Sequence, residues 1–122
     1  MRTRAALAAL GLLPLLAAPL AAADLPTLGK GDALTFDPAD LRDDMRPRFE
    51  IMKAKCVKCH TMERTIIAIK TGIAPVSGQP FDRSATKAYG IKMMRKPDAD
   101  MSKEQVKAVV ELMNYLLDET AR

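Results

Sequence analysis

The pentapeptide Cys56-Val57-Lys58-Cys59-His60 constrains this 122-residue chain more than any other feature. Its C-x-x-C-H spacing is typical of a site at which a haem group is attached covalently. The two thiols would form thioether bonds to the haem vinyl groups, and the adjacent imidazole would bind the iron as its proximal ligand. The chain has two cysteines and one histidine, all in this motif. The sequence therefore predicts one haem per chain and leaves no thiol for a structural disulfide.

Two other interpretations of the motif fit the sequence less well. A zinc site normally takes four cysteine or histidine ligands, and this chain has three such residues in total. A thiol redox motif is expected between a strand and a helix, and no strand pattern precedes Cys56. Covalent haem attachment is therefore the interpretation that the residues favour.

The first 23 residues have the pattern of a secretory signal peptide. Arg2 and Arg4 give a charged start, an apolar run extends over residues 5–20, and the small residues 21–23 suit cleavage. We expect cleavage after Ala23, export to a bacterial periplasm, and a mature protein that does not span a membrane. A retained membrane anchor is the alternative, because the apolar run is only just long enough to cross a bilayer.

The charge balance gives no indication of nucleic-acid binding. The whole chain has 19 basic and 15 acidic residues, a net charge of +4. Removal of Arg2 and Arg4 with the signal peptide would leave 17 basic residues and reduce the net charge to +2. Two haem propionates would lower it further, so the working protein lacks the strongly basic character that nucleic-acid partners require.

Proline, glycine and capping residues divide the rest of the chain into short helices. The predicted segments are an extended lead-in over 24–36, helices over 38–46, 47–55, 62–71 and 84–95, a loop over 74–82, and a C-terminal helix after residue 102. No strand pattern of comparable strength occurs, so we expect an all-α fold of about four to five short helices. The predicted organisation is a signal peptide (1–23), an N-terminal extension with a short helix (24–46) and one domain (47–122).

Local signals predict where these helices begin and end. Asp37 and Thr61 are expected to cap the helices that follow them, and Gly72 is expected to end the helix before it. The C-terminal helix has the clearest start, because Ser102 and Gln105 form a capping box. Its apolar residues recur at helical spacing, namely Val106, Val109, Val110, Met113, Leu116 and Leu117.

The loop over residues 74–82 is expected to support the histidine. Pro75, Gly78 and Pro80 mark it as irregular chain that could pass close to the haem. A backbone carbonyl near Pro75 would then accept a hydrogen bond from the second ring nitrogen of His60, which would orient the ring and raise its basicity.

The sixth position on the iron is a separate question, because the motif uses the single histidine. It would be filled by a methionine, by a weaker ligand such as lysine, or left open to water or gas. Met52, Met101 and Met113 are assigned to helix packing. Met62 lies too close to His60 to reach the opposite face, and Met45 precedes the motif on a short acidic helix. Met93 and Met94 remain, at the end of a predicted helix about 33 residues after His60. We favour Met94, with Met93 as the alternative.

The order C-x-x-C-H, then a methionine, then a capped C-terminal helix containing Tyr115-Leu116, resembles the small class I monohaem cytochromes c. The resemblance covers about residues 47–119 and implies a class I cytochrome c-like fold around one covalently bound haem c. It implies thioether bonds at Cys56 and Cys59, His60 as proximal ligand and Met94 as distal ligand. By the same resemblance Arg64 would lie near a haem propionate.

The chain departs from the family pattern in its two adjacent methionines and in the charged pair Arg95-Lys96 that follows them. The departure leaves the choice between Met93 and Met94 open.

These features predict a periplasmic single-haem electron-transfer protein that cycles between Fe(II) and Fe(III) with histidine and methionine as axial ligands. No substrate chemistry is needed, so we expect no enzyme activity and no catalytic residues. The alternatives are a haem subunit of a larger periplasmic oxidoreductase, docked through the 24–46 extension, and a five-coordinate haem sensor.

Basic residues flank both halves of the predicted site and suggest a partner. They are Lys53, Lys55, Lys58, Arg64, Lys70, Lys92, Arg95 and Lys96. If they border the exposed haem edge, they would steer the protein, as a monomer or as part of a redox complex, onto acidic surfaces of redox partner proteins. The alternative is that they only solvate the surface.

Overall fold

Four α-helices make up half of the computed structural model, which describes residues 24–121. The predicted signal peptide lies outside the described residues. The helices are α1 (Arg46–Lys55), α2 (Glu63–Thr71), α3 (Arg83–Met94) and α4 (Lys103–Thr120). Three single-turn 3₁₀ helices, Gly31–Ala33, Pro38–Asp40 and Cys56–Lys58, and two short strands, β1 (Thr27–Leu28) and β2 (Thr35–Phe36), complete it. The expectation of a mostly helical fold is confirmed, and the two strands are an addition to it. None of the helices in residues 24–121 has the length and apolar character needed to cross a membrane.

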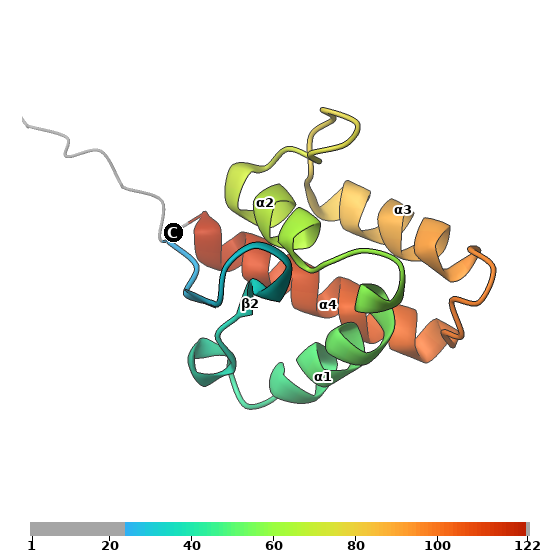
Figure 1. The fold of residues 1–122 in the computed structure, drawn as a ribbon, viewed down its shortest axis with the longest axis horizontal. Coiled ribbons are helices and arrows are strands. Elements are labelled where there is room, and N and C mark those ends of the chain that lie inside the picture. The colour runs from blue at the N-terminus through green and yellow to red at the C-terminus, as the bar shows by residue number, and fades with distance from the viewer. Residues whose placement is uncertain (1–23, 122) are drawn as a thin grey trace, which may run out of the picture.

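Helix α4 organises the fold because it contacts each of the other three helices (Figure 1). Its start is the predicted capping box: the Ser102 hydroxyl accepts from the Gln105 amide at 3.1 Å, and the Gln105 side chain accepts from the Ser102 amide at 3.0 Å. The buried face of α4 consists of Val106, Val109, Leu112, Met113 and Leu116. Four of these were predicted; Leu112 was not, and the predicted Val110 and Leu117 are only partly buried. A helix of 18 residues therefore presents one continuous apolar stripe to the rest of the molecule.

The close approach of α3 to α4 depends on a glycine. Gly90 is buried, and a methyl group at this position would lie 2.9 Å from Cγ2 of Val110 and 3.1 Å from Cγ1 of Val106. Gly90 lowers the intrinsic helix propensity of α3, but its lack of a side chain allows α3 to pack closely against α4.

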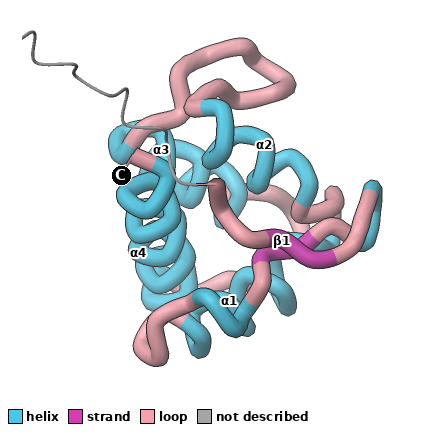
Figure 2. The backbone as a smooth tube through the Cα atoms, turned by 90° about the vertical axis from the view of Figure 1, so that its left-hand side faces the viewer, coloured by secondary structure: helices cyan, strands magenta, loops and turns pink. Residues whose placement is uncertain are grey.

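The N-terminal extension is part of the core. Strands β1 and β2 pair antiparallel, with Thr27 opposite Phe36, and lie beside α2 (Figure 2). The Phe36 side chain is 1% exposed and meets the ring of Phe49 edge-on, with the ring centroids 6.3 Å apart. Leu41 is also buried. The extension is thus fixed to the helical domain by apolar contacts. Its lead-in was predicted as extended chain without strands, and it forms a two-stranded hairpin.

Two predicted helix starts differ from the structure. Asp37 does cap a turn, since its carboxylate accepts from the Ala39 amide at 2.9 Å, but that turn is a 3₁₀ helix that ends at Asp40. Leu41 then adopts an extended backbone and enters the core, which prevents a longer helix. Thr61 does not cap α2: the N-cap is Met62, whose sulfur lies 3.7 Å from the hydroxyl of Thr35.

The boundaries of α2 and α3 are otherwise close to the predictions. Gly72 ends α2 in the left-handed conformation, with φ of 68°, as predicted. Asp82 caps α3, and its carboxylate accepts from the amides of Ser84 and Ala85 at 2.9 and 3.0 Å. These hydrogen bonds, led by the one from Ala85, lower the pKa of Asp82.

Candidate functional site

A cavity of about 540 Å³ lies between the C-x-x-C-H segment, α3 and the N-terminal half of α4. Its volume falls within the range of about 300–1,000 Å³ that is usual for small-molecule and cofactor sites. Cys56, Cys59 and His60 all line it, together with Arg64 on α2 and Met93 on α3. The structure therefore gathers the three motif residues and two other predicted site residues around one space.

The walls of this cavity are mostly apolar. They are formed by Met52 of α1, Ala68 of α2, the segment from Ala74 to Val76, Phe81, Tyr89 of α3, and Val106, Val109 and Met113 of α4. The phenol of Tyr89 lies 3.0 Å from the hydroxyl of Ser77, which ties the loop after α2 to α3. Such a lining suits a large, flat and largely apolar group with a few polar attachment points.

The imidazole of His60 is oriented by the backbone. Its Nδ1 lies 2.9 Å from the carbonyl oxygen of Thr61. Because a carbonyl oxygen only accepts hydrogen bonds, Nδ1 must donate, and the neutral ring then carries its lone pair on Nε2. His60 is thus held in the tautomer that a metal ligand requires. The carbonyl expected near Pro75 is not this partner: Pro75 lines the cavity, and the residue next to the histidine supplies the oxygen.

The two thiols lie where α1 passes into the motif. Cys56 is the C-cap of α1 and begins the 3₁₀ turn Cys56–Lys58, whereas Cys59 follows that turn and is exposed. Burial of Cys56 raises its pKa from 9.0 to about 11. A thiol-disulfide active site depends on a lowered thiol pKa, so the environment of Cys56 does not favour that chemistry. Both thiols are free.

The structure separates the two candidate methionines. Met93 lines the cavity, whereas Met94, which the sequence favoured, is not among the lining residues. Adjacent residues on a helix point about 100° apart, so the two side chains have different surroundings although both are partly buried. The packing of α3 selects Met93, three residues after the buried Gly90, which lines the same wall.

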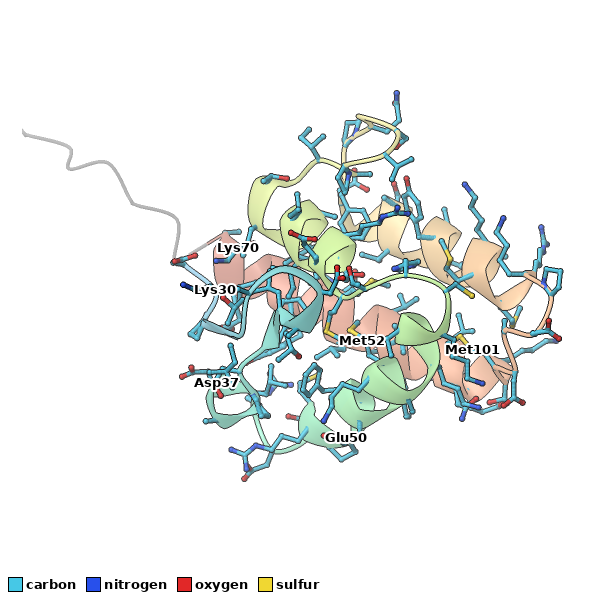
Figure 3. The ribbon with its side chains drawn as sticks, in the orientation of Figure 1. Lys30, Asp37, Glu50, Met52, Lys70 and Met101 are labelled. Atoms are coloured by element: carbon cyan, nitrogen blue, oxygen red, sulfur yellow. The ribbon has the colours of Figure 1, made fainter. Side chains whose placement is uncertain are left out.

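Three further methionines line the cavity although the sequence assigned them to helix packing. Met52 lies on α1 and Met101 lies just before α4 (Figure 3), and Met113 lies on α4 itself. Met52 and Met113 are buried as predicted, at 1% and 6% exposed, and Met101 is partly buried and packs against the core. The spacing of Met113 from Val106 and Val109 indicates a shared face, but only the arrangement of the helices shows that this face borders a cavity.

Eight basic residues were predicted to border the site. Five of them line the cavity, namely Lys55, Lys58, Arg64, Lys92 and Lys96. Two of these, Lys55 and Lys58, pair with Asp100 at 2.7 and 3.6 Å. The hydrogen bond from Lys55 is the main cause that lowers the pKa of Asp100. Lys53 and Lys70 lie outside the cavity and pair with Glu50 and Asp24.

Comparisons with models of protein families, with curated proteins and with solved structures found no match for this chain. Within residues 24–121, no group of three or more histidine, cysteine, aspartate or glutamate side chains could hold a metal ion. The soft donors around the cavity are two thiols, one imidazole and the thioethers of four methionines, and lysine amines and hydroxyl groups line it as well.

Proposed function

We propose that the cavity holds one haem c and that the protein transfers single electrons. The observation that carries this proposal is the position of Cys56, Cys59 and His60 on one wall of a mostly apolar cavity of about 540 Å³. The bound haem would supply the Fe(II)/Fe(III) couple. The mostly helical fold is compatible with a small class I cytochrome c-like domain, which is the fold that we propose.

The chain's own residues have distinct parts in this proposal. Cys56 and Cys59 would each form a thioether bond, and His60 would bind iron through Nε2 while Nδ1 donates to the Thr61 carbonyl. The apolar side chains of α1 and α4 on the cavity wall would shield a bound haem from water, and such shielding is one determinant of a reduction potential. Arg64 is an exposed residue on the cavity wall, where a guanidinium suits a haem propionate.

We propose Met93 in place of Met94 as the sixth ligand. A thioether opposite the histidine raises the potential and suits an electron carrier. This choice is supported by the position of Met93 on the cavity wall, because Met94 does not line the cavity. The two residues are neighbours in α3 and have the same side chain, so each is the natural control for the other.

The proposed setting is a bacterial periplasm, reached through the signal peptide predicted over residues 1–23. We propose that acidic surfaces of redox partner proteins dock at the mouth of the cavity, near Arg64, Lys92 and Lys96. The rate of electron transfer should then fall as ionic strength rises. Lys92→Gln should slow it as well, and Lys53→Gln should not, because Lys53 lies outside the cavity and pairs with Glu50.

Docking of the 24–46 extension on a larger oxidoreductase has less support. Phe36 and Leu41, two of its apolar side chains, are buried against this chain's own core. They are therefore not offered to another protein, and the structure gives no reason to prefer a subunit over a free carrier.

Visible spectra of the purified ferric and ferrous protein, with and without carbon monoxide, test the proposal. We expect a six-coordinate haem with a sulfur-to-iron charge-transfer band and no carbon monoxide binding. Met93→Ala should remove the band, lower the reduction potential and admit carbon monoxide, and Met94→Ala should leave all three unchanged. Carbon monoxide binding to the unaltered protein would instead indicate a sensor, and an effect confined to Met94→Ala would assign the ligand to Met94.

A further inference from the structure

The connection between α3 and α4, residues 95–102, is tied to the motif by one carboxylate. Oδ2 of Asp100 lies 2.7 Å from Nζ of Lys55 and 3.6 Å from Nζ of Lys58. Lys55 is the last residue of α1, and Lys58 lies inside the C-x-x-C-H motif. Asp100 thus joins the two sides of the cavity that would lie on either side of a bound haem.

Apart from Met101, which packs against the core, the other contacts of this connection are local. The backbone amides of Arg95, Lys96 and Ala99 donate to the carbonyls of Ile91, Met93 and Lys96 at 3.2, 3.1 and 3.2 Å. Asp98 and Asp100 both have positive φ, of 61° and 47°, a conformation that is uncommon for residues other than glycine. Within residues 24–121, the two pairs of Asp100 are the ion pairs that this connection makes.

The same connection forms part of the cavity wall. Lys96, Pro97, Ala99 and Met101 all line the cavity, and Met93 lies two residues before the connection begins. A displacement of the connection would therefore open the cavity on the side of the proposed sixth ligand. Loss of the Asp100 carboxylate would favour this displacement, because it would remove the only negative charge that pairs with Lys55 and Lys58 in the described residues.

We propose that Asp100 is a positioning residue that holds the 95–102 connection closed over the cavity and keeps Met93 in place as a ligand. This inference rests on the proposed haem site for its effect on the iron. Its effect on the connection itself does not depend on haem. The Lys55 side chain is 19% exposed and the Asp100 side chain is 75% exposed, so the expected effect of the pair is small, as for other surface pairs.

The experiment compares Asp100→Asn with Asp98→Asn in the full-length protein. Asp98 lies in the same connection and, like Asp100, has a positive φ. Its side chain makes no hydrogen bond or ion pair in the described residues. Because exposed pairs contribute little, Asp100→Asn should speed carbon monoxide binding to the ferrous protein by about two- to fivefold. It should also weaken the sulfur-to-iron band, and Asp98→Asn should change neither.

Amide hydrogen exchange of residues 95–102 provides a readout that does not depend on haem. Asp100→Asn should speed exchange there by about two- to fivefold, and the increase should vanish when Lys55 and Lys58 are both replaced by methionine. Equal exchange in the Asp100 and Asp98 variants would overturn the inference. A protein without haem would instead overturn the proposed function, and the exchange rates would still decide the role of Asp100.

Discussion

The two halves of α4 carry the same apolar pattern and meet different surroundings. In the packed half, Leu112 and Leu116 are 0% and 1% exposed and belong to one core with the rings of Phe36 and Phe49. In the open half, Val106 and Val109 face the cavity of about 540 Å³. Beside the packed half there is a hollow of only about 150 Å³, between the extension and the end of α4.

The difference shows that an apolar stripe does not by itself determine what it packs against. Aromatic rings from β2 and α1 fill the packed half. The open half also has two rings, Phe81 and Tyr89, but together with its methionine and alanine side chains they leave space. The chain has three phenylalanines and no tryptophan, so it has few large side chains with which to fill a second region. The open half is accordingly the region where a bound group would complete the core.

Truncation of a side chain in each half should give the largest contrast. Phe36→Ala removes a ring that is 1% exposed, so it should lower the free energy of unfolding by about 3–5 kcal/mol. Val109→Ala removes two methyl groups beside an existing cavity and should cost about 1 kcal/mol. Urea unfolding of both variants measures this. Equal losses would mean that the two halves are packed alike.

The buried thiol of Cys56 should give the haem-free chain a distinct pH dependence. Its pKa is about 11 when folded, against 9.0 for an ordinary thiol, so the unfolded chain loses this proton first. The contribution of this thiol to the free energy of unfolding is therefore fully present below about pH 9 and is lost as the pH rises through about 11. The loss should amount to about 2 kcal/mol. Urea unfolding from pH 8 to pH 11, with Cys56→Ser as the control, should show it. A thioether carries no such proton, so the haem-loaded protein should lack this contribution.

Filling the open half should give a smaller change in stability and a clear change in binding. Val109→Phe adds apolar surface to the cavity wall, so the haem-free chain should gain up to about 1 kcal/mol. The added ring would take space from a bound haem, and the yield of covalently attached haem should fall. Thermal unfolding and the haem absorbance per protein measure the two effects. A variant that loses stability and keeps full haem content would contradict the description of this half as open.

Sequence signals predicted the features that depend on neighbours along the chain. The Ser102 capping box, the Gly72 helix end and the apolar face of α4 each arise within a few residues, and each is found in the structure. The hairpin that carries Phe36 was missed because its ring is buried against Phe49, which lies 13 positions further along the chain. Local propensity contains no information about such a contact.

The candidate site shows the same division. The motif identified Cys56, Cys59 and His60, and the structure places all three on the cavity. The choice between Met93 and Met94 depends on the rotation of α3, which is set by the packing of Gly90 against Val106 and Val110. The role of Asp100 depends on pairs with lysines about 45 positions earlier, which no spacing rule predicts.

The most direct test of the central claim is acid-acetone extraction of the exported protein, followed by measurement of the haem that stays with the polypeptide. We expect one haem per chain to resist extraction from the unaltered protein, and none to resist it when Cys56 and Cys59 are both replaced by alanine. An unaltered protein that carries no covalent haem, or a double variant that retains it, would contradict the assignment of this cavity as a haem c site.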